Sequence, residues 1–389
     1  MNFSIVPFGC KVNQYQAQII RESMISFGSI ETEIDDSEIL FVVGCLVTQR
    51  AQAECFRLIE KYRNEKTIIA AGCAGSKNSE TSVAKLPPNN LEMLPDLIGF
   101  DGEILKSISN FSGHTRAMVA IQYGCSNYCS YCIVPILRGK PRNRQISEIV
   151  CEVEKLAETG HPEVVLCGTE IGHFDKMTEL LSKLSETKIK RIRLSSFNPR
   201  HLTPELVSEI LQIPKVAPHL HLPIQSGSNN ILRKMRRGYS REHFMSLVSS
   251  AKKTNPEVGI TTDIIIGFPG EYDDDFKETL DIIEKAGFSK CHVFPFSPRP
   301  NTDAFNMKPV HSKTVTIRAK KARDLANTLV LKALCDNIGN RVSVLVEKDS
   351  GGFTGSYNRV RINGEVTQGE LVICRITGIE GNILIGEKV

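Results

Sequence analysis

The sequence predicts an α/β protein with three successive parts. These are a βαβ parallel-sheet domain over residues 1–112, a partial (βα)6 barrel over residues 113–336 and a small OB-like β-barrel over residues 337–389. Two observations predict this architecture. Apolar runs of strand length alternate with helical patterns through most of the chain, as in parallel sheets that are covered by helices. After residue 341 the helical patterns stop, and short alternating runs between glycine-rich turns replace them.

Three strands separated by helices are expected in the N-terminal part. The apolar runs Phe3–Phe8, Ile39–Val43 and Thr67–Ala71 are each followed by a Gly-Cys pair. Helical patterns from Gln14 to Ile25 and from Ala51 to Tyr62 lie between them. This alternation produces parallel strands whose carboxyl ends lie along one edge of the sheet. The stretch that follows is less regular, because paired prolines and asparagines interrupt it.

The middle part repeats the alternation about six times, which predicts an open barrel with ligands at the carboxyl ends of its strands. The candidate strands are Met118–Gln122, Val164–Cys167, Arg191–Ser195, His219–Leu222, Ile260–Ile266 and Lys290–Phe294. The helical patterns between and after them include Glu148–Glu158, Pro204–Leu211, Arg241–Lys252, Tyr272–Lys285 and Ser312–Cys335.

The C-terminal part has the pattern of a small all-β unit. Alternating runs at Val342–Val346, Arg359–Ile362, Leu371–Ile376 and Ile383–Ile385 predict a five-stranded barrel of the OB kind. Barrels of this kind often bind nucleic acid, although the nearly balanced charge of this segment gives that role little support.

The composition narrows the class of protein. No apolar run reaches the ~18 residues of a membrane span, and the N-terminal sequence lacks the features of a secretion signal. We therefore expect a cytoplasmic protein without membrane attachment. Its 12 cysteines are too few and too scattered for a disulfide scaffold, which leaves metal or redox chemistry.

The net charge of +4 is unevenly distributed, because the middle part carries the whole positive excess. Basic residues gather there in three clusters, which begin at Arg138, Lys188 and Arg233. Such clusters attract a polyanion. A solvated helix face is the simpler explanation for any one of them, but three in one segment favour a polyanionic partner.

The most specific motif is Cys125-Ser-Asn-Tyr-Cys129-Ser-Tyr-Cys132, which places three cysteines on one loop after a predicted strand. Zinc fits poorly, because the loop offers no nearby fourth ligand. A four-iron cluster fits better, since three thiolates would leave one iron open for an exogenous ligand. Buried structural cysteines are the remaining alternative.

A second set of cysteines, Cys10, Cys45 and Cys73, follows the ends of three predicted strands. Because these ends lie along one edge of a parallel sheet, the three thiolates can converge on a second cluster. Unrelated core cysteines are the alternative. The other six fit no such pattern and are expected to be small core residues; they are Cys55, Cys151, Cys167, Cys291, Cys335 and Cys374.

The Cys125/Cys129/Cys132 spacing, with Tyr131 before the last cysteine, resembles the radical S-adenosylmethionine (SAM) superfamily. Further motifs narrow the resemblance to the methylthiotransferases. It covers nearly the whole chain, and the C-terminal part is similar to the TRAM domain of that family. The supporting motifs begin at Tyr123, Arg138, Leu194, His219, Met235, Thr262 and His292.

The segment Gly9-Cys10-Lys-Val-Asn-Gln-Tyr15 resembles the branch that acts on threonylcarbamoyladenosine in tRNA. The branches that act on isopentenyladenosine and on a ribosomal-protein aspartate differ at this motif. Two positions depart from the family pattern. Val43-Gly44 stands where Asn-Thr is usual, and Tyr123 stands where Asp or Glu is usual. The N-terminal cysteines are intact, so these departures concern the surroundings of the second cluster.

The resemblance implies SAM and two 4Fe-4S clusters as cofactors, one on each cysteine set. The implied reaction is methylthiolation of threonylcarbamoyladenosine at adenine C2, on the 3′ side of the anticodon. It proceeds by radical C–H activation, sulfur insertion and S-methylation, and the adenine must leave its stack to react. The implied partners are the tRNA anticodon stem-loop and a reductant such as flavodoxin or ferredoxin. We expect a monomer, and the sulfur donor is not indicated.

Candidate SAM contacts lie at the ends of the barrel strands. The loop that starts at Gly168 would hold the methionine amino group, serines and a glutamine the carboxylate or ribose, and the loop at Ile266 the adenine. Ordinary turns or strand-end caps are the alternatives. His219 and His221 share a strand face and are either core or catalytic residues. The full assignment to SAM is Tyr131, Gly168, Thr169, Glu170, Ser195, Ser196, Gln225, Ser226, Ile266 and Gly267.

Basic residues beside the cysteine loop, in the later cluster and in the C-terminal part are assigned to RNA phosphates. They are Arg138, Lys140, Arg142, Arg144, Arg236, Arg237, Arg359 and Arg361. Two other functions are compatible with the sequence. One is methylthiolation of a ribosomal-protein side chain, against which the basic middle part argues. The other is a non-catalytic iron–sulfur sensor that binds RNA.

Overall fold

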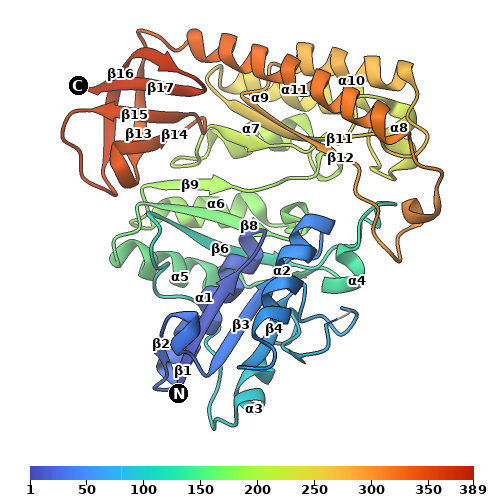
Figure 1. Cartoon of the computed structure of the whole chain (residues 1–389). Coiled ribbons are helices and arrows are strands. Elements are labelled where there is room, and N and C mark those ends of the chain that lie inside the picture. The colour runs from blue at the N-terminus through green and yellow to red at the C-terminus, as the bar shows by residue number, and fades with distance from the viewer. Residues whose placement is uncertain (80) are drawn as a thin grey trace.

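The computed structural model describes residues 1–79 and 81–389. Figure 1 shows the N-terminal sheet below, the strands and helices of the middle part above it, and the C-terminal barrel at one end. Among the described residues, no helix combines the length and hydrophobicity that a bilayer span requires.

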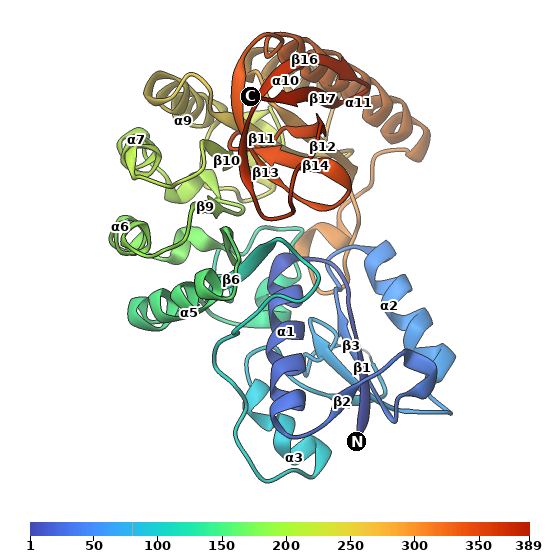
Figure 2. The same cartoon turned by 90° about the vertical axis from the view of Figure 1, so that its left-hand side faces the viewer.

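The N-terminal sheet is parallel and has the strand order β2-β1-β3-β4-β5. Helices α1 and α2 lie on its two sides (Figure 2). Every residue of β3 is buried, because alternate side chains pack against α1 on one face and α2 on the other. This two-sided burial explains its continuous apolar run. The bounds are β1 Asn2–Pro7, α1 Lys11–Ser26, β2 Ile30–Glu31, β3 Ile39–Gly44, α2 Gln49–Tyr62, β4 Thr67–Gly72, β5 Ala84–Lys85 and α3 Leu94–Ile98.

The middle part contains all six predicted strands, in chain order around an open barrel. The first three are β6 Arg116–Tyr123, β8 Glu163–Gly168 and β9 Arg191–Leu194, with the short β7 Arg142–Asn143 antiparallel to β6. The others are β10 His219–His221, β11 Gly259–Ile266 and β12 Lys290–Pro295. Single bridges from Ile192 to Val216 and from Ser196 to His221 join the two sheets.

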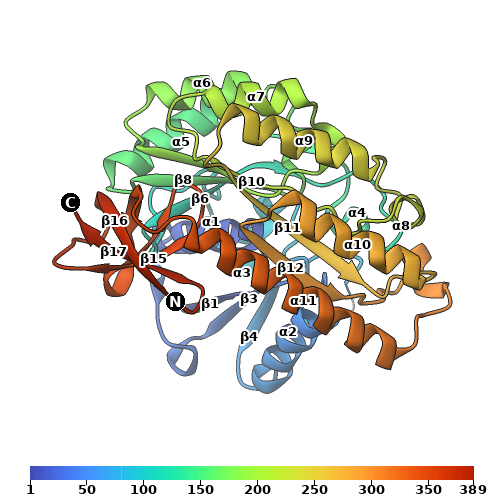
Figure 3. The same cartoon turned by 90° about the horizontal axis from the view of Figure 1, so that it is seen from above.

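Helices surround these strands on the outside (Figure 3). They shield the outer face of the strands from water, and each ends near the strand that follows it. The long ones are α5 Ile146–Glu158, α6 Met177–Glu186, α7 Pro204–Gln212, α9 Arg241–Thr254, α10 Asp273–Ala286 and α11 Ser312–Cys335. Two short ones, α4 Val134–Arg138 and α8 Asn229–Lys234, lie near the carboxyl ends of the strands.

The C-terminal part is a closed barrel with the order β13-β14-β15-β17-β16. Four of its strands are those that the alternating runs predict. The additional one is β14, whose sequence Gly-Gly-Phe-Thr carries too little alternation to be recognised. The bounds are β13 Arg341–Val346, β14 Gly351–Thr354, β15 Arg359–Asn363, β16 Leu371–Glu380 and β17 Ile383–Lys388.

A buried carboxylate joins the base of the middle barrel to the C-terminal barrel. Glu163 is fully buried and pairs with Arg191 and, at 2.7 Å, with Arg193. Burial opposes its ionisation, but the two guanidinium groups lower the pKa of Glu163 overall. Arg193 also donates to the carbonyl oxygens of Gly355 at 2.8 Å and Thr354 at 3.1 Å, on the β14–β15 turn. The turn therefore closes the barrel base.

The six cysteines outside the two motifs do not all lie in the core. Cys55, Cys167 and Cys374 are buried as expected, and Cys291 is half-buried. The expectation is wrong for Cys151 and Cys335, which are exposed. Cys151 lies on the solvent side of α5, and Cys335 is the last residue of α11.

The Glu163→Gln substitution should destabilise the protein strongly. It removes the carboxylate that pairs with the buried Arg191 and Arg193, so the free energy of unfolding should fall by about 3–5 kcal/mol. Denaturant unfolding measures the change. The control is Glu158→Gln, which breaks an exposed pair with Lys188 and should leave the free energy of unfolding almost unchanged. Equal effects of the two substitutions would contradict the role of Glu163.

Candidate functional site

The structure brings Cys10, Cys45 and Cys73 together at the carboxyl edge of the N-terminal sheet. Cys10 is exposed at the start of α1, and the other two are buried after β3 and β4. Gly9 has a φ of +83°, and a Cβ there would lie 2.3 Å from the Cβ of Cys45. Only glycine therefore allows the loop of Cys10 to lie against Cys45. Burial raises the pKa of the Cys45 thiol to about 11, and Cys73 and Cys10 add to this.

Asn13 fixes the loops that carry these cysteines. Its Nδ2 donates to the carbonyl oxygens of Phe8 and Gly44, both at 2.9 Å. A Cβ on Gly72, which has a φ of +62°, would lie 2.8 Å from the Asn13 Oδ1. One buried amide thus touches all three strand ends. The sequence pattern assigned it no role, although it lies within the motif that starts at Gly9.

Arg138 contacts this cysteine set, so its assignment to RNA phosphates is wrong. The side chain is buried, and its Nε donates to the Cys73 Sγ at 3.3 Å. Its Nη2 donates to the Asn13 Oδ1. Burial opposes its charge, yet the neighbouring Cys73 and Cys10 raise the pKa of Arg138. A phosphate of a bound RNA has no access to this guanidinium group.

The loop from Cys125 to Cys132 follows β6, as predicted. The Cys125 amide donates to the Gly139 carbonyl at 3.0 Å, and the Ser130 amide donates to the Met235 carbonyl at 3.1 Å. Burial raises the pKa of the Cys125 thiol to about 11 and that of the Cys132 thiol to about 12. Because a metal binds the thiolate, loading of this loop must release protons.

Arg237 contacts a cysteine of this loop, just as Arg138 contacts a cysteine of the first set. The assignment of Arg237 to RNA phosphates is therefore also wrong. It is buried, and its Nη1 lies 3.4 Å from both the Cys129 Sγ and the Tyr131 hydroxyl. Its Nη2 donates to the Pro223 carbonyl at 3.2 Å. Each three-cysteine set therefore has one buried guanidinium group in hydrogen-bonding contact with a thiol sulfur.

The thiols of each set fit an iron–sulfur cluster better than a single ion. Among residues 1–79 and 81–389, no three His, Cys, Asp or Glu side chains converge on one point as ligands of a single ion would. A four-iron cluster binds each thiolate at a different iron, so its ligands need not converge in this way. A nearby cation also stabilises the negative charge of thiolates.

A cavity of about 650 Å³ lies between the N-terminal loop and the inside of the barrel. Cys10 lines it together with Gly168, Ser195 and Ser196 from the ends of β8 and β9. Tyr357 of the C-terminal barrel lines its far end. The cavity thus joins one thiol of the N-terminal set to three of the residues that are predicted to bind SAM.

The remaining candidate SAM residues lie outside the lining of this cavity. Thr169 Oγ1 accepts from the Gly124 amide at 3.1 Å, and Glu170 Oε1 accepts from the Asn198 amide at 3.0 Å. Thr169 therefore lies next to the start of the cysteine loop, and Glu170 lies next to the turn after β9. The side chains of Ser226 and Ile266 are buried in protein contacts, and their assignment to SAM stays a prediction.

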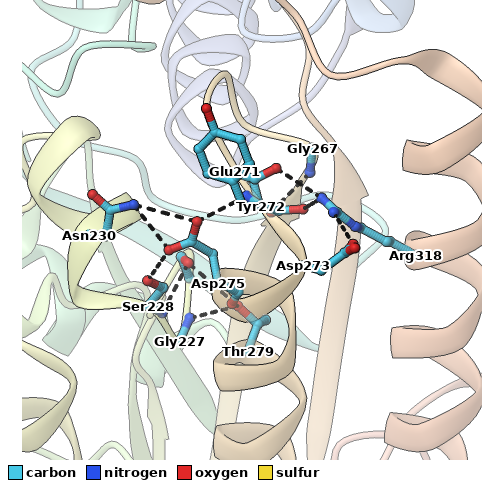
Figure 4. Close-up of polar contacts among 12 residues, drawn as sticks. Gly227, Ser228, Asn230, Gly267, Glu271, Tyr272, Asp273, Asp275, Thr279 and Arg318 are labelled. Atoms are coloured by element: carbon cyan, nitrogen blue, oxygen red, sulfur yellow. Dashed lines mark hydrogen bonds and ion pairs between the residues drawn. The ribbon is translucent and has the colours of Figure 1, made fainter.

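Asp275 orders the loop after β10, which contains Gln225 and Ser226. Its carboxylate accepts from the Ser228 hydroxyl at 2.6 Å, from Asn230 at 3.1 Å and from the Tyr272 amide at 2.9 Å (Figure 4). Burial opposes the shift, but these hydrogen bonds lower the pKa of Asp275. The first turn of α10 thereby fixes a predicted ligand loop.

Glu271 orders the neighbouring loop after β11. Its carboxylate accepts from the Gly267 amide at 3.1 Å and from Arg318 of α11 at 2.8 Å (Figure 4). Gly267 has a φ of +77°, which favours glycine at this turn. Burial raises the pKa of Glu271, while these partners oppose the rise. Both predicted ligand loops after β10 and β11 are therefore held by side chains that sequence reasoning did not identify.

His219 and His221 both line the cavity, which agrees with their shared strand face. His219 is buried, and burial lowers its pKa well below the usual value. The His221 ring nitrogens lie 2.8 Å from the Thr261 hydroxyl and 3.2 Å from the Asp263 carboxylate. Both ring nitrogens of His221 are therefore engaged by protein groups, whereas Nδ1 of the buried His219 has no hydrogen-bond partner among the described residues.

The other basic residues that are assigned to RNA phosphates are either buried or exposed, and exposure decides whether a phosphate can reach them. Arg144 is wrong, because its largely buried side chain pairs with Glu152 at 2.6 Å and donates to the Tyr15 hydroxyl at 2.9 Å. The remaining candidates are exposed on three separate parts of the molecule, and two of them form surface ion pairs. These exposed residues are Lys140, Arg142, Arg236, Arg359 and Arg361.

Comparisons with known proteins agree with this site. Residues 119–283 match the radical SAM superfamily, and residues 2–93 match an uncharacterized protein family, UPF0004. The fold resembles that of TsrM from Kitasatospora setae, a radical S-adenosylmethionine methyltransferase. The TM-score is 0.55 at 12% identity over 78% of this chain and 76% of that chain.

Two curated relatives match this chain over nearly the whole length of both proteins. The threonylcarbamoyladenosine tRNA methylthiotransferase MtaB of Chlamydia pneumoniae is 34% identical over 100% of this chain and 98% of its own. The tRNA-2-methylthio-N(6)-dimethylallyladenosine synthase of Moorella thermoacetica is 31% identical over the same shares. The chain therefore belongs to the radical SAM methylthiotransferases, enzymes that use SAM and carry two 4Fe-4S clusters.

Proposed function

We propose that this enzyme methylthiolates threonylcarbamoyladenosine in tRNA, at adenine C2 on the 3′ side of the anticodon. The observation that carries the proposal is the cavity that Cys10 shares with Gly168, Ser195 and Ser196. A substrate base in this cavity would contact both the N-terminal cysteine site and the ligand-binding end of the barrel. The motif around Cys10 and the 34% identity to MtaB support this substrate.

In this proposal each cysteine set holds one 4Fe-4S cluster. Bound there with SAM, the clusters supply reductive formation of a carbon radical and the sulfur that is inserted. Cys125, Cys129 and Cys132 hold one cluster. The auxiliary cluster is on Cys10, Cys45 and Cys73.

The chain itself orients the reactants. Gly168, Ser195 and Ser196 bind polar groups of SAM. Tyr131 belongs to the cysteine loop, and Glu170 lies near the loop and shapes its surroundings. The closed barrel base keeps water out of the cavity from below, which protects a reactive intermediate. Thr261 and Asp263 hold the His221 ring in place at the cavity wall.

The exposed basic residues and the C-terminal barrel bind the tRNA in this proposal. Its anticodon stem-loop presents phosphates to Lys140, Arg142, Arg359 and Arg361. The C-terminal barrel is a TRAM domain of the OB kind in this proposal, with domains at residues 1–112, 113–336 and 337–389. The enzyme acts as a cytoplasmic monomer with a protein reductant.

Nucleoside mass spectrometry of tRNA from a strain that lacks this gene tests the substrate. The methylthio group should be missing from threonylcarbamoyladenosine and should return when the gene is restored. Its loss from dimethylallyladenosine instead would replace the proposed substrate with that of the Moorella relative. An unchanged tRNA pool with a lost ribosomal-protein modification would overturn the tRNA assignment.

Cys10→Ala should separate the two halves of the reaction. The variant should bind about half the iron of the original protein and still cleave SAM, but it should form no methylthiolated product. Iron analysis and chromatography of 5′-deoxyadenosine measure these quantities. Cys151→Ala, at an exposed cysteine, is the matched control and should change none of them. Methylthiolated product from Cys10→Ala would refute the assignment of Cys10.

Arg138→Gln should lower the reduction potential of the auxiliary cluster, because it removes a buried positive charge beside the Cys73 sulfur. A redox titration followed by electron paramagnetic resonance measures this potential. The cluster on the Cys125 loop serves as an internal control and should keep its potential. If both potentials shift equally, Arg138 acts on the fold as a whole and not on one cluster.

A further inference from the structure

A basic pocket lies on the outer side of the Cys125–Cys132 loop, and we propose that an acidic electron-donor protein docks there. The pocket is formed by Arg200, Arg233 and Arg236 and has a volume of about 530 Å³. The inference rests on the proposed function to the extent that the loop cysteines hold a cluster that must receive electrons. The partner is a small protein that carries a low-potential flavin or iron–sulfur group and an acidic surface.

The pocket has a positive charge that the described structure leaves largely uncompensated. No acidic side chain is among its lining residues. Arg236 pairs with Asp303 at the rim. The guanidinium groups of Arg200 and Arg233 have no hydrogen-bond or ion-pair partner within residues 1–79 and 81–389, and both side chains are exposed. Such a surface attracts a protein with clustered carboxylates.

Both walls of the pocket are connected to the cysteine loop by the residue next to the exposed arginine. Arg237 follows Arg236 and lies 3.4 Å from the Cys129 Sγ. His201 follows Arg200, and its Nε2 lies 3.0 Å from the Asn127 Oδ1 on the loop. Arg236 has a φ of +58°, a strained conformation that turns the two adjacent guanidinium groups in opposite directions. A donor in the pocket would therefore lie against residues whose chain neighbours contact the cysteine loop.

The pocket is separate from the reaction cavity. The two share no lining residue. Arg233 is on α8, and Arg200 is in the 3-10 helix Pro199–His201. Figures 1 and 3 show α8 at the end of the barrel opposite the C-terminal barrel. A donor bound there would leave the opening next to Cys10 free for tRNA, which is why the geometry favours a donor over an RNA phosphate.

The step that this docking serves is a transfer of one electron. The reduced donor is oxidised by one electron and the cluster on the loop is reduced by one, with no bond or proton transferred between the proteins. Because opposite charges steer the encounter, the rate of association should fall as salt is added. The path from the pocket to Cys129 is short, since Arg237 touches the sulfur itself.

The test uses the full-length protein with both clusters loaded and reduced flavodoxin as the probe. Stopped-flow absorbance measures the second-order rate of flavodoxin oxidation by the original protein and by an Arg200→Glu/Arg233→Glu variant. The variant should react at least about tenfold more slowly at low salt and show a weaker dependence on salt. Reduction by dithionite, a small molecule that needs no docking, should keep its rate. Arg323→Glu on α11 is the matched charge control, since Arg323 is exposed and does not line the pocket.

The outcomes separate this inference from the proposed function. An unchanged flavodoxin rate overturns the docking site, and a loss of anticodon stem-loop affinity in the same variant would assign the pocket to RNA. If dithionite yields no 5′-deoxyadenosine even with the original protein, that result contradicts the proposed function. It does not bear on the docking site. Should the double variant lose its cluster, the single Arg233→Gln variant allows the same comparison, and a rate equal to that of the original protein again overturns the site.

Discussion

Parallel strands end along a common edge, and this constraint places both cysteine sets of the candidate site. The ends of β1, β3 and β4 carry Cys10, Cys45 and Cys73, and the end of β6 carries the loop that starts at Cys125. The cysteines of the first set come from three separate strand ends, whereas those of the second set share one loop. The strands supply rigid, buried supports, and the loops after them supply the chemistry. The cavity exists because two such edges face each other across it.

Charge is balanced locally at each cysteine set. Arg138 lies against Cys73 and Arg237 against Cys129, and both are buried. A buried cation without a partner is strongly unfavourable, so these arginines are compatible with the fold only if anionic groups surround them. Thiolates that bind a metal are such groups. The same neighbours explain why two residues of basic clusters point inward, while Arg236, next to Arg237, remains at the surface.

Side chains far along the chain make the site rigid. Asp275 and Glu271, at the start of α10, hold the loops after β10 and β11, and Glu163 anchors the C-terminal barrel at the base. These carboxylates are not among the residues that are expected to touch SAM or the substrate. They hold the positions of the loops that would contact one, and such preorganisation lowers the entropy that must be lost when a ligand binds. The C-terminal barrel thus contributes to the cavity through Tyr357 as well as forming a unit of its own.

The sequence alone determined the alternation of strands and helices, the six barrel strands and the two cysteine sets, because periodicity and Gly-Cys pairs are local signals. It could not determine which arginines are buried. Arg138, Arg144 and Arg237 belong to basic clusters, and only their contacts with groups distant in sequence or on other elements turn them away from solvent. These partners are Cys73 for Arg138, Glu152 and Tyr15 for Arg144, and Cys129 for Arg237. Asn13 and Asp275 were missed for the same reason: their partners are distant in sequence, and hydrogen bonds between distant segments exist only once the chain has folded.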